Sequence, residues 1–341
     1  MGLIHFTAGI NSALRVQKWA VELWHVHQRD QFFYHFTSKD GMNIVHEKLD
    51  FTKAAGYQMT EGLMMPFIGD GVINDEVLED EEEAPDFYNM TWTISQLRNA
   101  GRYAGEETNQ QTEYKLPTEI RNGLGDWMAN KRDIAIFDAI AVAPSKVYLV
   151  NDRATTATIV AGDLMTLQQF VRAKVYAIST AYPKLPPIKI AKVGEKTVYR
   201  YVGLMHDHVA YDLSMNDPVY QQTVRDAGVR GNDNPMFTGA LIDYMGMLLH
   251  AHDNCPIYTT WGTGAIAGAE SYLLGRQAVI VGIGGYKMQG KNGYLKWVEK
   301  RFDYENQFGI AVGIIKGEAK SVFNSLDFSV VAIRSSRTNI S

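Results

Sequence analysis

The stretch Asn234-Pro235-Met236-Phe237-Thr238-Gly239-Ala240-Leu241 is the most distinctive local pattern in this chain of 341 residues. It comes after a turn rich in glycine and asparagine, residues 228–234, and it leads into a mixed apolar stretch that reaches His250. Glycine and proline at such spacing are typical of turns. The stretch therefore marks a turn, and the elements on either side of it decide the fold class.

Helices and strands are predicted on both sides of this turn in an irregular order. Apolar residues recur at helical spacing over residues 117–142, which predicts one long helix. A second helix is predicted from Asp163 or Thr166, the latter with Gln169 as a capping box, and a shorter one from Pro218 to Gly228. Strands are predicted at residues 146–150, 155–160, 197–204, 278–283, 308–315 and 328–333. Because no regular βαβ alternation and no repeat is present, we predict the α+β class.

The composition excludes several classes of protein. Hydrophobic residues make up 46% and charged residues 21%, which is typical of a globular chain. A net charge of −5 argues against a protein that binds nucleic acid through overall positive charge. Cys255 is the only cysteine, which excludes a disulfide framework. We see no signal peptide and no apolar run of about 18 residues, so we expect a protein that is made and kept inside a cell, or inside a particle assembled there.

The first part of the chain contains a helix without an obvious partner. Trp19 and Leu23 belong to an apolar series at helical spacing, which predicts an amphipathic helix over residues 11–30. Glycine and charged residues interrupt the segment after this helix. We therefore expect the helix to find its partner outside its own neighbourhood.

Residues 46–103 predict an extended β-hairpin with an acidic tip. Tyr88, Met90, Trp92 and Ile94 alternate with polar residues, as in a strand with one apolar face. Eight of the 38 carboxylates of the chain lie between Asp75 and Asp86. A segment this acidic does not line a buried core, so we expect the tip to lie in solvent or to contact Lys and Arg of a neighbouring chain.

Two histidine pairs are the strongest candidates for chemistry. On a strand His206 and His208 would share a face and could grip one metal ion, with a further ligand from His250 or His252. The simpler interpretation is a strand-to-helix junction whose histidines bond backbone groups. For His250, His252 and Cys255 we prefer a capped turn over a nucleophilic pair.

The glycine-rich segment 282–293 matches neither nucleotide-binding motif. Lys287 stands where the third glycine of the dinucleotide fingerprint belongs, and the phosphate-loop pattern is missing. We interpret Gly282, Gly284 and Gly285, together with Gly290 and Gly293, as a mobile connecting loop. The sequence thus carries no catalytic motif and predicts no cofactor and no metal.

The opening stretch, together with Tyr244-Met245-Gly246 and Leu248-Leu249-His250-Ala251-His252, resembles the signature of major capsid proteins of N4-like tailed bacteriophages. Weaker similarities occur in matching order, in residues 53–59, 124–127, 133–137, 201–206, 308–313 and 327–328. The resemblance covers most of the chain from Lys53 onward. It implies the HK97-like capsid fold, an α+β architecture.

The resemblance also implies a division of the chain into the parts of that fold. Residues 1–45 would be the N-terminal arm and residues 46–103 the E-loop, a hairpin that lies across an adjacent subunit. The P-domain, with residues 117–142 as its long spine helix, would comprise residues 104–162 and 301–341. The A-domain, around the capsomer axis, would be residues 163–300.

The expected function is that of a structural virion protein, not an enzyme. We expect a major capsid subunit that self-assembles in the host cytoplasm into hexamers and pentamers of an icosahedral shell around double-stranded DNA. The expected partners are its own copies, a portal, scaffold or decoration proteins, and packaged DNA in non-specific contact, without a membrane. The candidate intersubunit residues are Trp19, Leu23, Glu79, Asp80, Glu81, Glu82, Tyr88, Met90, Trp92 and Ile94.

Two other classes stay open at this point. The alternative enzyme would be a metal-dependent hydrolase that uses His206, His208, His250 and His252. A third class would be a ring- or tube-forming virion or secretion component.

Overall fold

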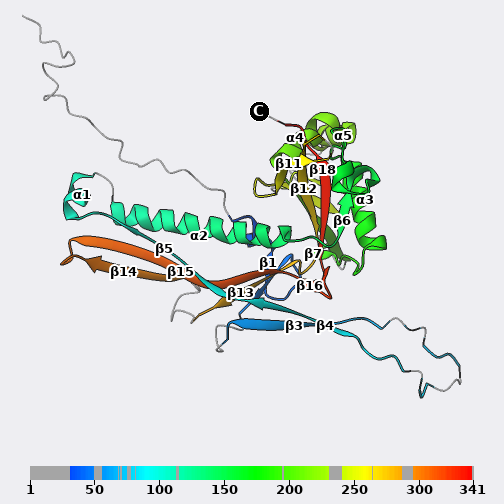
Figure 1. Cartoon of the computed structure of the whole chain (residues 1–341), viewed down its shortest axis with the longest axis horizontal. Helices are drawn as coiled ribbons and strands as arrows, with labels where there is room; N and C mark the ends of the chain where they lie inside the picture. The colour runs from blue at the N-terminus through cyan, green and yellow to red at the C-terminus, as the bar shows by residue number, and fades with distance from the viewer. Residues whose placement is uncertain are drawn as a thin grey trace, which may run out of the picture. The chain divides into compact units, whose positions relative to one another are not determined.

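The computed structural model describes residues 31–49, 56–67, 69, 71–74, 78–80, 82–112, 115–193, 196–229, 240–262, 264–285 and 295–339 (Figure 1). The helix predicted over residues 11–30 and most of the stretch 234–241 lie outside these ranges. The described chain forms two compact units. The smaller comprises residues 98–130 and 295–313, and the larger residues 31–97, 131–294 and 314–341.

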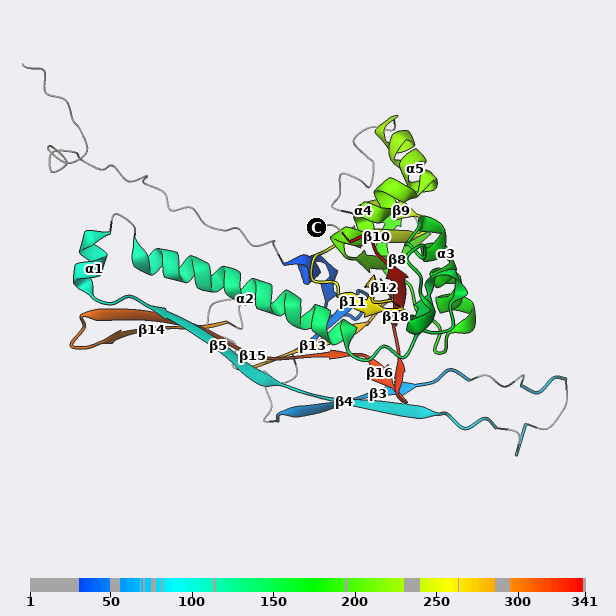
Figure 2. The same ribbon diagram turned by 45° about the horizontal axis from the view of Figure 1, so that its top comes forward.

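The smaller unit is a helix packed on a narrow sheet. It contains α1 (Glu106–Gln111), the first part of α2 (Leu116–Ala141), and the strands β5 (Ser95–Arg102), β14 (Lys296–Phe302) and the first part of β15 (Gln307–Lys320). β14 runs antiparallel to β15, and β5 also pairs with β15. Helix α2 lies along one face of these strands (Figure 2), where a Cβ atom at Gly101 would meet the Ile120 side chain at 2.6 Å.

The first sheet of the larger unit has a different neighbour on each face. It contains β1 (Thr37–Ser38), β2 (Val45–Lys48), β13 (Val279–Gly284) and the last part of β15, with Val279 opposite both Val45 and Lys320. Because side chains alternate along a strand, Val279 and Val281 share a buried cluster with Phe137 of α2. Ile280 points to the opposite face, where it packs against Met90 and Trp92.

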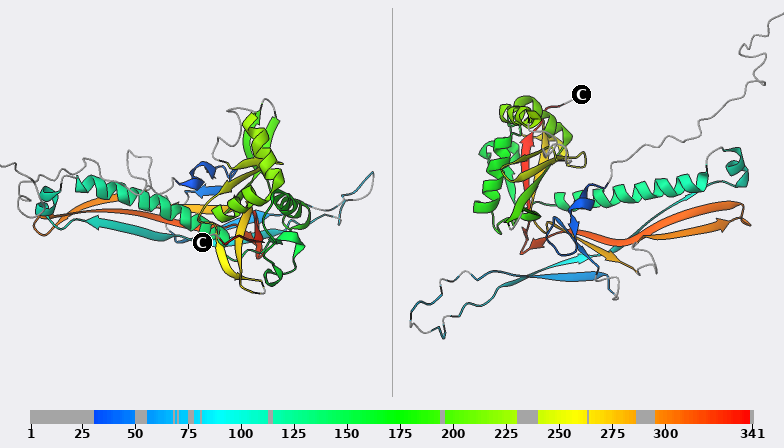
Figure 3. Two further views of the ribbon diagram at one scale, coloured as in Figure 1. Left: turned by 90° about the horizontal axis from the view of Figure 1, so that it is seen from above. Right: turned by 180° about the vertical axis from the view of Figure 1, so that it is seen from behind.

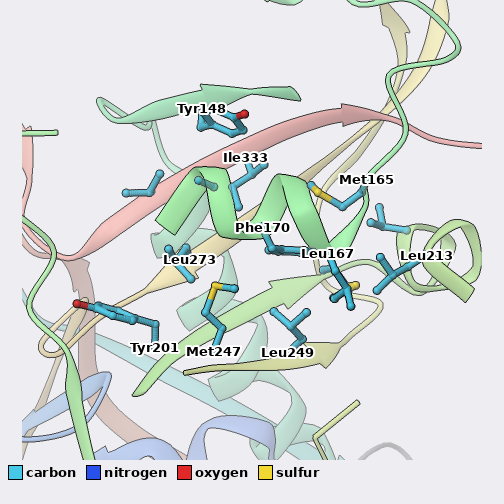
Figure 4. Close-up of a cluster of buried hydrophobic side chains, with 14 of the residues drawn as sticks. Tyr148, Met165, Leu167, Phe170, Tyr201, Leu213, Met247, Leu249, Leu273 and Ile333 are labelled. Carbon is cyan, nitrogen blue, oxygen red and sulfur yellow. The ribbon is translucent and has the colours of Figure 1, made fainter. Parts of the chain in front are cut away.

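The second sheet of the larger unit carries the largest buried cluster. Its main strand order is β6, β18, β12, β8, β10, β9. Helix α3 (Leu167–Val175) presents Leu167 and Phe170 to this sheet, and both are fully buried. Figure 4 shows their contact partners, which include Met247, Leu249, Leu273 and Ile333. The strands of this sheet are β6 (Val147–Leu149), β7 (Ile188–Val193), β8 (Lys196–Met205), β9 (Ile242–Tyr244), β10 (Met247–Ala251), β11 (Ile257–Trp261), β12 (Ile266–Leu274) and β18 (Val330–Ser336).

The remaining described elements lie outside these sheets. The strands are β3 (Gln58–Met64), β4 (Phe87–Thr93), β16 (Val322–Phe323) and β17 (Leu326–Asp327), and the helices are α4 (Asp207–Asn216) and α5 (Pro218–Val229). The short helical turns are η2 (Phe32–Phe36), η4 (Val150–Asp152), η5 (Thr156–Thr158) and η6 (Tyr176–Thr180). Among the described helices, none is long and apolar enough to span a bilayer.

Most predicted elements are confirmed, including the long helix, the Thr166 cap and the helix from Pro218. The strand predicted at residues 155–160 is wrong, because this segment forms the 3-10 helix η5. There Thr155 and Thr158 make a reciprocal capping box that satisfies their backbone groups locally. Gly284 also differs from the prediction, since it lies in β13 rather than in the loop, whereas Gly282 lies within the strand predicted at residues 278–283.

Charged side chains hold both the turn at Phe32–Phe33 and the end of α2. The Asp133 carboxylate accepts hydrogen bonds from the backbone N–H groups of Phe32 and Phe33, the latter at 3.3 Å. Lys320 donates to the carbonyl of Val142, just beyond α2, and pairs with Asp327 at 2.8 Å. A cation at a helix C-terminus satisfies carbonyls that lack intrahelical partners.

Candidate functional site

The hairpin formed by β3 and β4 is the candidate site. The two strands pair in register from Gln58 opposite Thr93 to Met64 opposite Phe87. Beyond this pairing, the hydrogen bond from Met65 N–H to the Asp86 carbonyl, at 2.9 Å, continues the hairpin. Figure 3 shows the two arms extending past the strands. A hairpin is therefore present within the predicted range 46–103, with its strands at the root and a long connection at the tip. It spans residues 58–93 only, because residues 45–48 pair with β13 and residues 95–102 pair with β15.

The root of the hairpin is anchored inside its own chain. Met90 and Trp92 are buried against Ile280 of β13, and Tyr88 and Ile94 are half-buried. A Cβ atom at Gly282 would stand 2.0 Å from Trp92 Cη2, so only glycine lets the indole lie on β13. Trp92 and Met90 thus fix the root of the hairpin. Their predicted role in contacts between subunits stays a prediction.

The described carboxylates at the tip of the hairpin are exposed to solvent. Glu79, Asp80 and Glu82 are exposed, and Glu82 accepts a hydrogen bond from the Asp80 N–H at 2.9 Å. Glu83 accepts from the Gly69 N–H at 2.8 Å, which joins the two arms of the hairpin. Glu81 lies outside the described residues, as do Trp19 and Leu23.

Exposed apolar side chains accompany these carboxylates, and the sequence interpretation missed them. Phe67, Ile73, Leu78 and Phe87 are each more than half exposed. Apolar side chains along one solvent-exposed arm are typical of an interaction surface rather than of a free loop. The available signal was the presence of large apolar residues within a stretch too acidic to enter a core.

A cavity of about 560 Å³ lies beside the hairpin arms. Hairpin residues from Leu63 to Phe67 and from Glu83 to Asp86 line one side, and Tyr182, Pro183, Lys184 and Phe328 line the other. Its lining is mostly apolar, with Lys184, Glu83 and Asp86 as charged groups. It has the character of a contact surface next to the hairpin, without a convergent set of catalytic groups.

The first histidine pair has a structural role. His206 caps α4, and its Nδ1 accepts the His208 N–H at 3.1 Å. The His208 ring approaches Arg337 instead of a second ligand, with 3.5 Å between His208 Nδ1 and Arg337 Nη1. Burial, followed by the nearby His208, lowers the pKa of His206. This geometry matches the predicted strand-to-helix junction.

The second histidine pair packs among aromatic rings. His250 and His252 lie about 5 Å from the Phe32 ring, with centroid distances of 5.3 and 5.4 Å. His252 Nδ1 accepts the Asn254 N–H at 3.1 Å, which confirms the capped turn. Burial raises the pKa of the Cys255 thiol above its usual range, so this thiol is not an activated nucleophile.

The described residues contain no group of three or more His, Cys, Asp or Glu side chains that could hold a metal ion. The hydrolase alternative needs ligands from both histidine pairs on one ion. Instead, His206 caps a helix and His252 supports a turn. The alternative is therefore not supported by the part of the chain that the structure describes.

Comparison with known proteins points to one kind of protein. A family model described as phage capsid protein matches residues 7–147 and 142–338. The major capsid protein of Pseudomonas phage KPP25 is 25% identical over 370 residues, which cover 92% of this chain and 93% of the relative.

Solved structures agree on the fold. The capsid of Ralstonia phage GP4 superposes with a TM-score of 0.82 at 22% identity, covering 100% of both chains. The capsid of cyanophage Pam1 gives 0.81 at 17% identity, covering 98% of this chain and 100% of the other. At such low identity the likeness establishes the fold alone, and it confirms the predicted α+β, HK97-like architecture.

Proposed function

The chain belongs to the phage capsid protein family, and we propose that it is the major subunit of a tailed-phage head, assembling as hexamers and pentamers into an icosahedral shell around double-stranded DNA. The family match runs from residue 7 to residue 338 and confirms the predicted capsid function and virion location. This match over nearly the whole chain is the observation that carries the proposal. The structure adds a hairpin whose tip lies in solvent, as an intersubunit arm requires.

We assign the parts of the fold as the sequence predicts. The N-terminal arm would be residues 1–45, the E-loop 46–103, the P-domain 104–162 with 301–341, and the A-domain 163–300. Strand β18 of the proposed P-domain pairs with β12 of the proposed A-domain, so these two parts would share one sheet. The E-loop assignment rests on the anchored root and the exposed tip of the β3–β4 hairpin.

Overlapping arms would supply the driving force for closure. Buried apolar area contributes about 25 cal/mol per Å², so exposed hairpin residues such as Phe67 and Phe87 favour association. Each contact is offset by the loss of translational and rotational freedom. Many linked weak contacts still hold a closed shell, because each bound arm raises the effective concentration of the next. In this role the chain needs no catalytic step.

We further propose that the chain belongs to the N4-like subgroup, on the strength of the stretch 234–241 and the segments that come after it. Portal and scaffold or decoration proteins would be its partners, and DNA would be enclosed rather than read. Assembly would take place in the host cytoplasm.

Electron microscopy of the purified, expressed protein tests the proposed function. We expect closed particles of uniform diameter, alone or with a co-expressed scaffold. Rings or open tubes under all of these conditions would contradict the shell proposal and favour the third class of protein.

A further inference from the structure

The C-terminal segment, residues 337–339, lies against helix α4 (Figure 1). The N–H of Thr338 donates to the Asp212 carboxylate at 2.8 Å. The Arg337 guanidinium approaches His208 in the first turn of α4, with 3.5 Å between Nη1 and the ring Nδ1. Positions 208 and 212 are neighbours on the surface of a helix, so both contacts lie on one face of α4.

Arg337 is a buried cation that forms no ion pair with a carboxylate of the described residues. Only 7% of the residue is exposed, and its Nε has no hydrogen-bond partner in the described part of the chain. Its Nη1 contacts three neutral groups, the His208 ring, the Thr338 carbonyl and the Asn339 side chain, at 3.5, 3.4 and 3.5 Å. A buried charge without a counter-ion is costly, so the position of Arg337 depends on these few neutral acceptors.

Both histidines at the start of α4 act as acceptors through Nδ1. A guanidinium carries only donors, so the His208 Nδ1 that faces Arg337 carries no proton. The same argument applies to His206, whose Nδ1 accepts the backbone N–H of His208 at 3.1 Å and thereby caps α4. Both rings are therefore neutral in this arrangement, with their proton on Nε2.

A proton on either Nδ1 removes an acceptor and adds a cation. The centroids of the His206 and His208 rings are 5.0 Å apart, so two protonated rings would stand next to each other and to Arg337. The N-terminus of a helix already carries a partial positive charge, which disfavours a cation at the cap. Protonation therefore weakens both the cap of α4 and the contact with Arg337.

Two nearby carboxylates oppose this effect at His206 without cancelling it. Asp207 and Asp253 favour the protonated ring, whereas burial, His208 and Arg337 disfavour it. The pKa of His206 is lowered on balance, with burial as the largest cause. A ring whose pKa is lowered in the folded state takes its proton more readily once the structure around it opens, so acid favours the open state.

The third carboxylate, Asp212, acts on the protonated form of His208. It follows His208 by one turn of α4, and its Oδ2 accepts from Thr338. Its Oδ1 is buried and has no hydrogen-bond partner among the described residues. A protonated His208 would therefore be attracted toward Asp212 and away from Arg337, which disturbs both contacts of the C-terminal segment.

We propose that His206, His208 and Arg337 form an acid-sensitive latch, which holds the C-terminal segment on α4 at neutral pH and releases it when the imidazoles take protons. The proposal goes beyond the proposed shell function, and it concerns the folded subunit, so its test does not depend on assembly. The latch joins α4 of the proposed A-domain to the last residues of the proposed P-domain. Acid would uncouple these two parts at this point.

Hydrogen exchange of the purified full-length chain tests the latch directly. Exchange is followed by mass spectrometry at pH 7.5 and pH 5.5, and each rate is corrected for the intrinsic effect of pH. An imidazole in an open segment titrates near pH 6.5, so a ring that takes its proton only after release favours release about tenfold at pH 5.5. We expect protection of residues 337–338 and of the first turn of α4 to fall by about this factor, while peptides from α3 and β12 keep their protection.

Two variants separate the latch from other titrating groups. His206→Asn with His208→Gln keeps a helix cap and an acceptor that do not titrate, so this variant should stay protected at both pH values. His208→Lys places a permanent cation beside Arg337 and should lose protection already at pH 7.5. His35→Gln removes an exposed histidine of η2 and serves as the control, which should show the acid response of the wild type. Circular dichroism and melting temperature verify folding of each variant.

Three outcomes would overturn the proposal. The first is unchanged protection of residues 337–338 in the wild type at pH 5.5, which would show that the segment does not respond to acid. The second is an equal acid-induced loss in the variant His206→Asn, His208→Gln, which would assign the response to another group. The third is full protection of folded His208→Lys at pH 7.5, which would show that the contact with Arg337 does not hold the segment.

Discussion

The Trp92 indole lies directly on the backbone of Gly282, where a Cβ atom would come within 2.0 Å of Trp92 Cη2. Trp92 is buried by this contact together with Ile280 and Met90. The contact joins the hairpin root to β13, a strand almost two hundred residues away in the sequence. The position and rigidity of the hairpin therefore depend on a glycine in another element.

Gly282→Ala should loosen the hairpin root. The added methyl group forces Trp92 out of its place, and overpacking of this kind costs about 1–3 kcal/mol of unfolding free energy. Urea unfolding of the unassembled subunit measures this loss. Adding Trp92→Ala to Gly282→Ala should cost less than the sum of the two single substitutions, because the clash disappears.

Gly125→Ala is the matched control for this substitution. Gly125 lies in helix α2, and a Cβ atom there would meet nothing within 4 Å. Alanine in a helix is favoured over glycine by about 1 kcal/mol, so this variant should gain stability. Equal stability of Gly282→Ala and the wild type would contradict the proposed role of the glycine.

Local patterns in the sequence predicted elements well where one segment determines its own structure. The predicted helix over residues 117–142 matches α2, Leu116–Ala141, because its apolar spacing and Pro117 at the first turn are local signals. The capping box of Thr155 and Thr158 is also a local interaction, but the sequence pattern predicted a strand at these residues. Their side chains satisfy backbone groups within the turn, and β-type residues alone did not reveal this.

The site was only partly predictable, because burial depends on contacts between distant segments. Alternation placed Met90 and Trp92 on one apolar face, but it could not show that Ile280 covers that face from within the same chain. The same limit applies to Gly282, because nothing in the local sequence shows that Trp92 of β4 lies upon it. The exposed acidic tip was predictable from charge alone, since carboxylates without partners stay in water.

Asp133 should make stability depend on pH. Burial raises the pKa of this carboxyl above 3.8, despite the N–H groups of Phe32 and Phe33 that it accepts from. The folded state thus holds the proton more tightly than the unfolded state, so the Asp133 contribution to stability falls as pH rises above 3.8 toward the higher folded-state pKa. Asp133→Asn should flatten this dependence above pH 3.8, as measured by urea unfolding at a series of pH values. An unchanged slope of unfolding free energy against pH in this variant would contradict the prediction.

Lys146 should make the stability of the subunit depend on pH in the alkaline range. Burial lowers its pKa from 10.5 to about 8, and its amine donates to the carbonyls of Pro183 and Phe328. The folded state then binds fewer protons than the unfolded state between these values, so stability should rise with pH from about 8 to 10.5. Lys146→Met should lose this rise and also lower stability at pH 7, because two carbonyls lose their donor. If stability rose by the same amount in the variant, the rise would belong to another titratable group.

Deleting residues 70–86 should separate folding from assembly. The deletion leaves residues 65–69 to connect Met64 with Phe87, and a connection of this length is common in hairpins. The root contacts of Met90 and Trp92 stay in place, so the subunit should melt within a few degrees of the wild type. Without the acidic tip the arms cannot hold neighbouring subunits, and electron microscopy should show few closed shells. Normal shells from this deletion would contradict the assignment of the hairpin as the intersubunit arm.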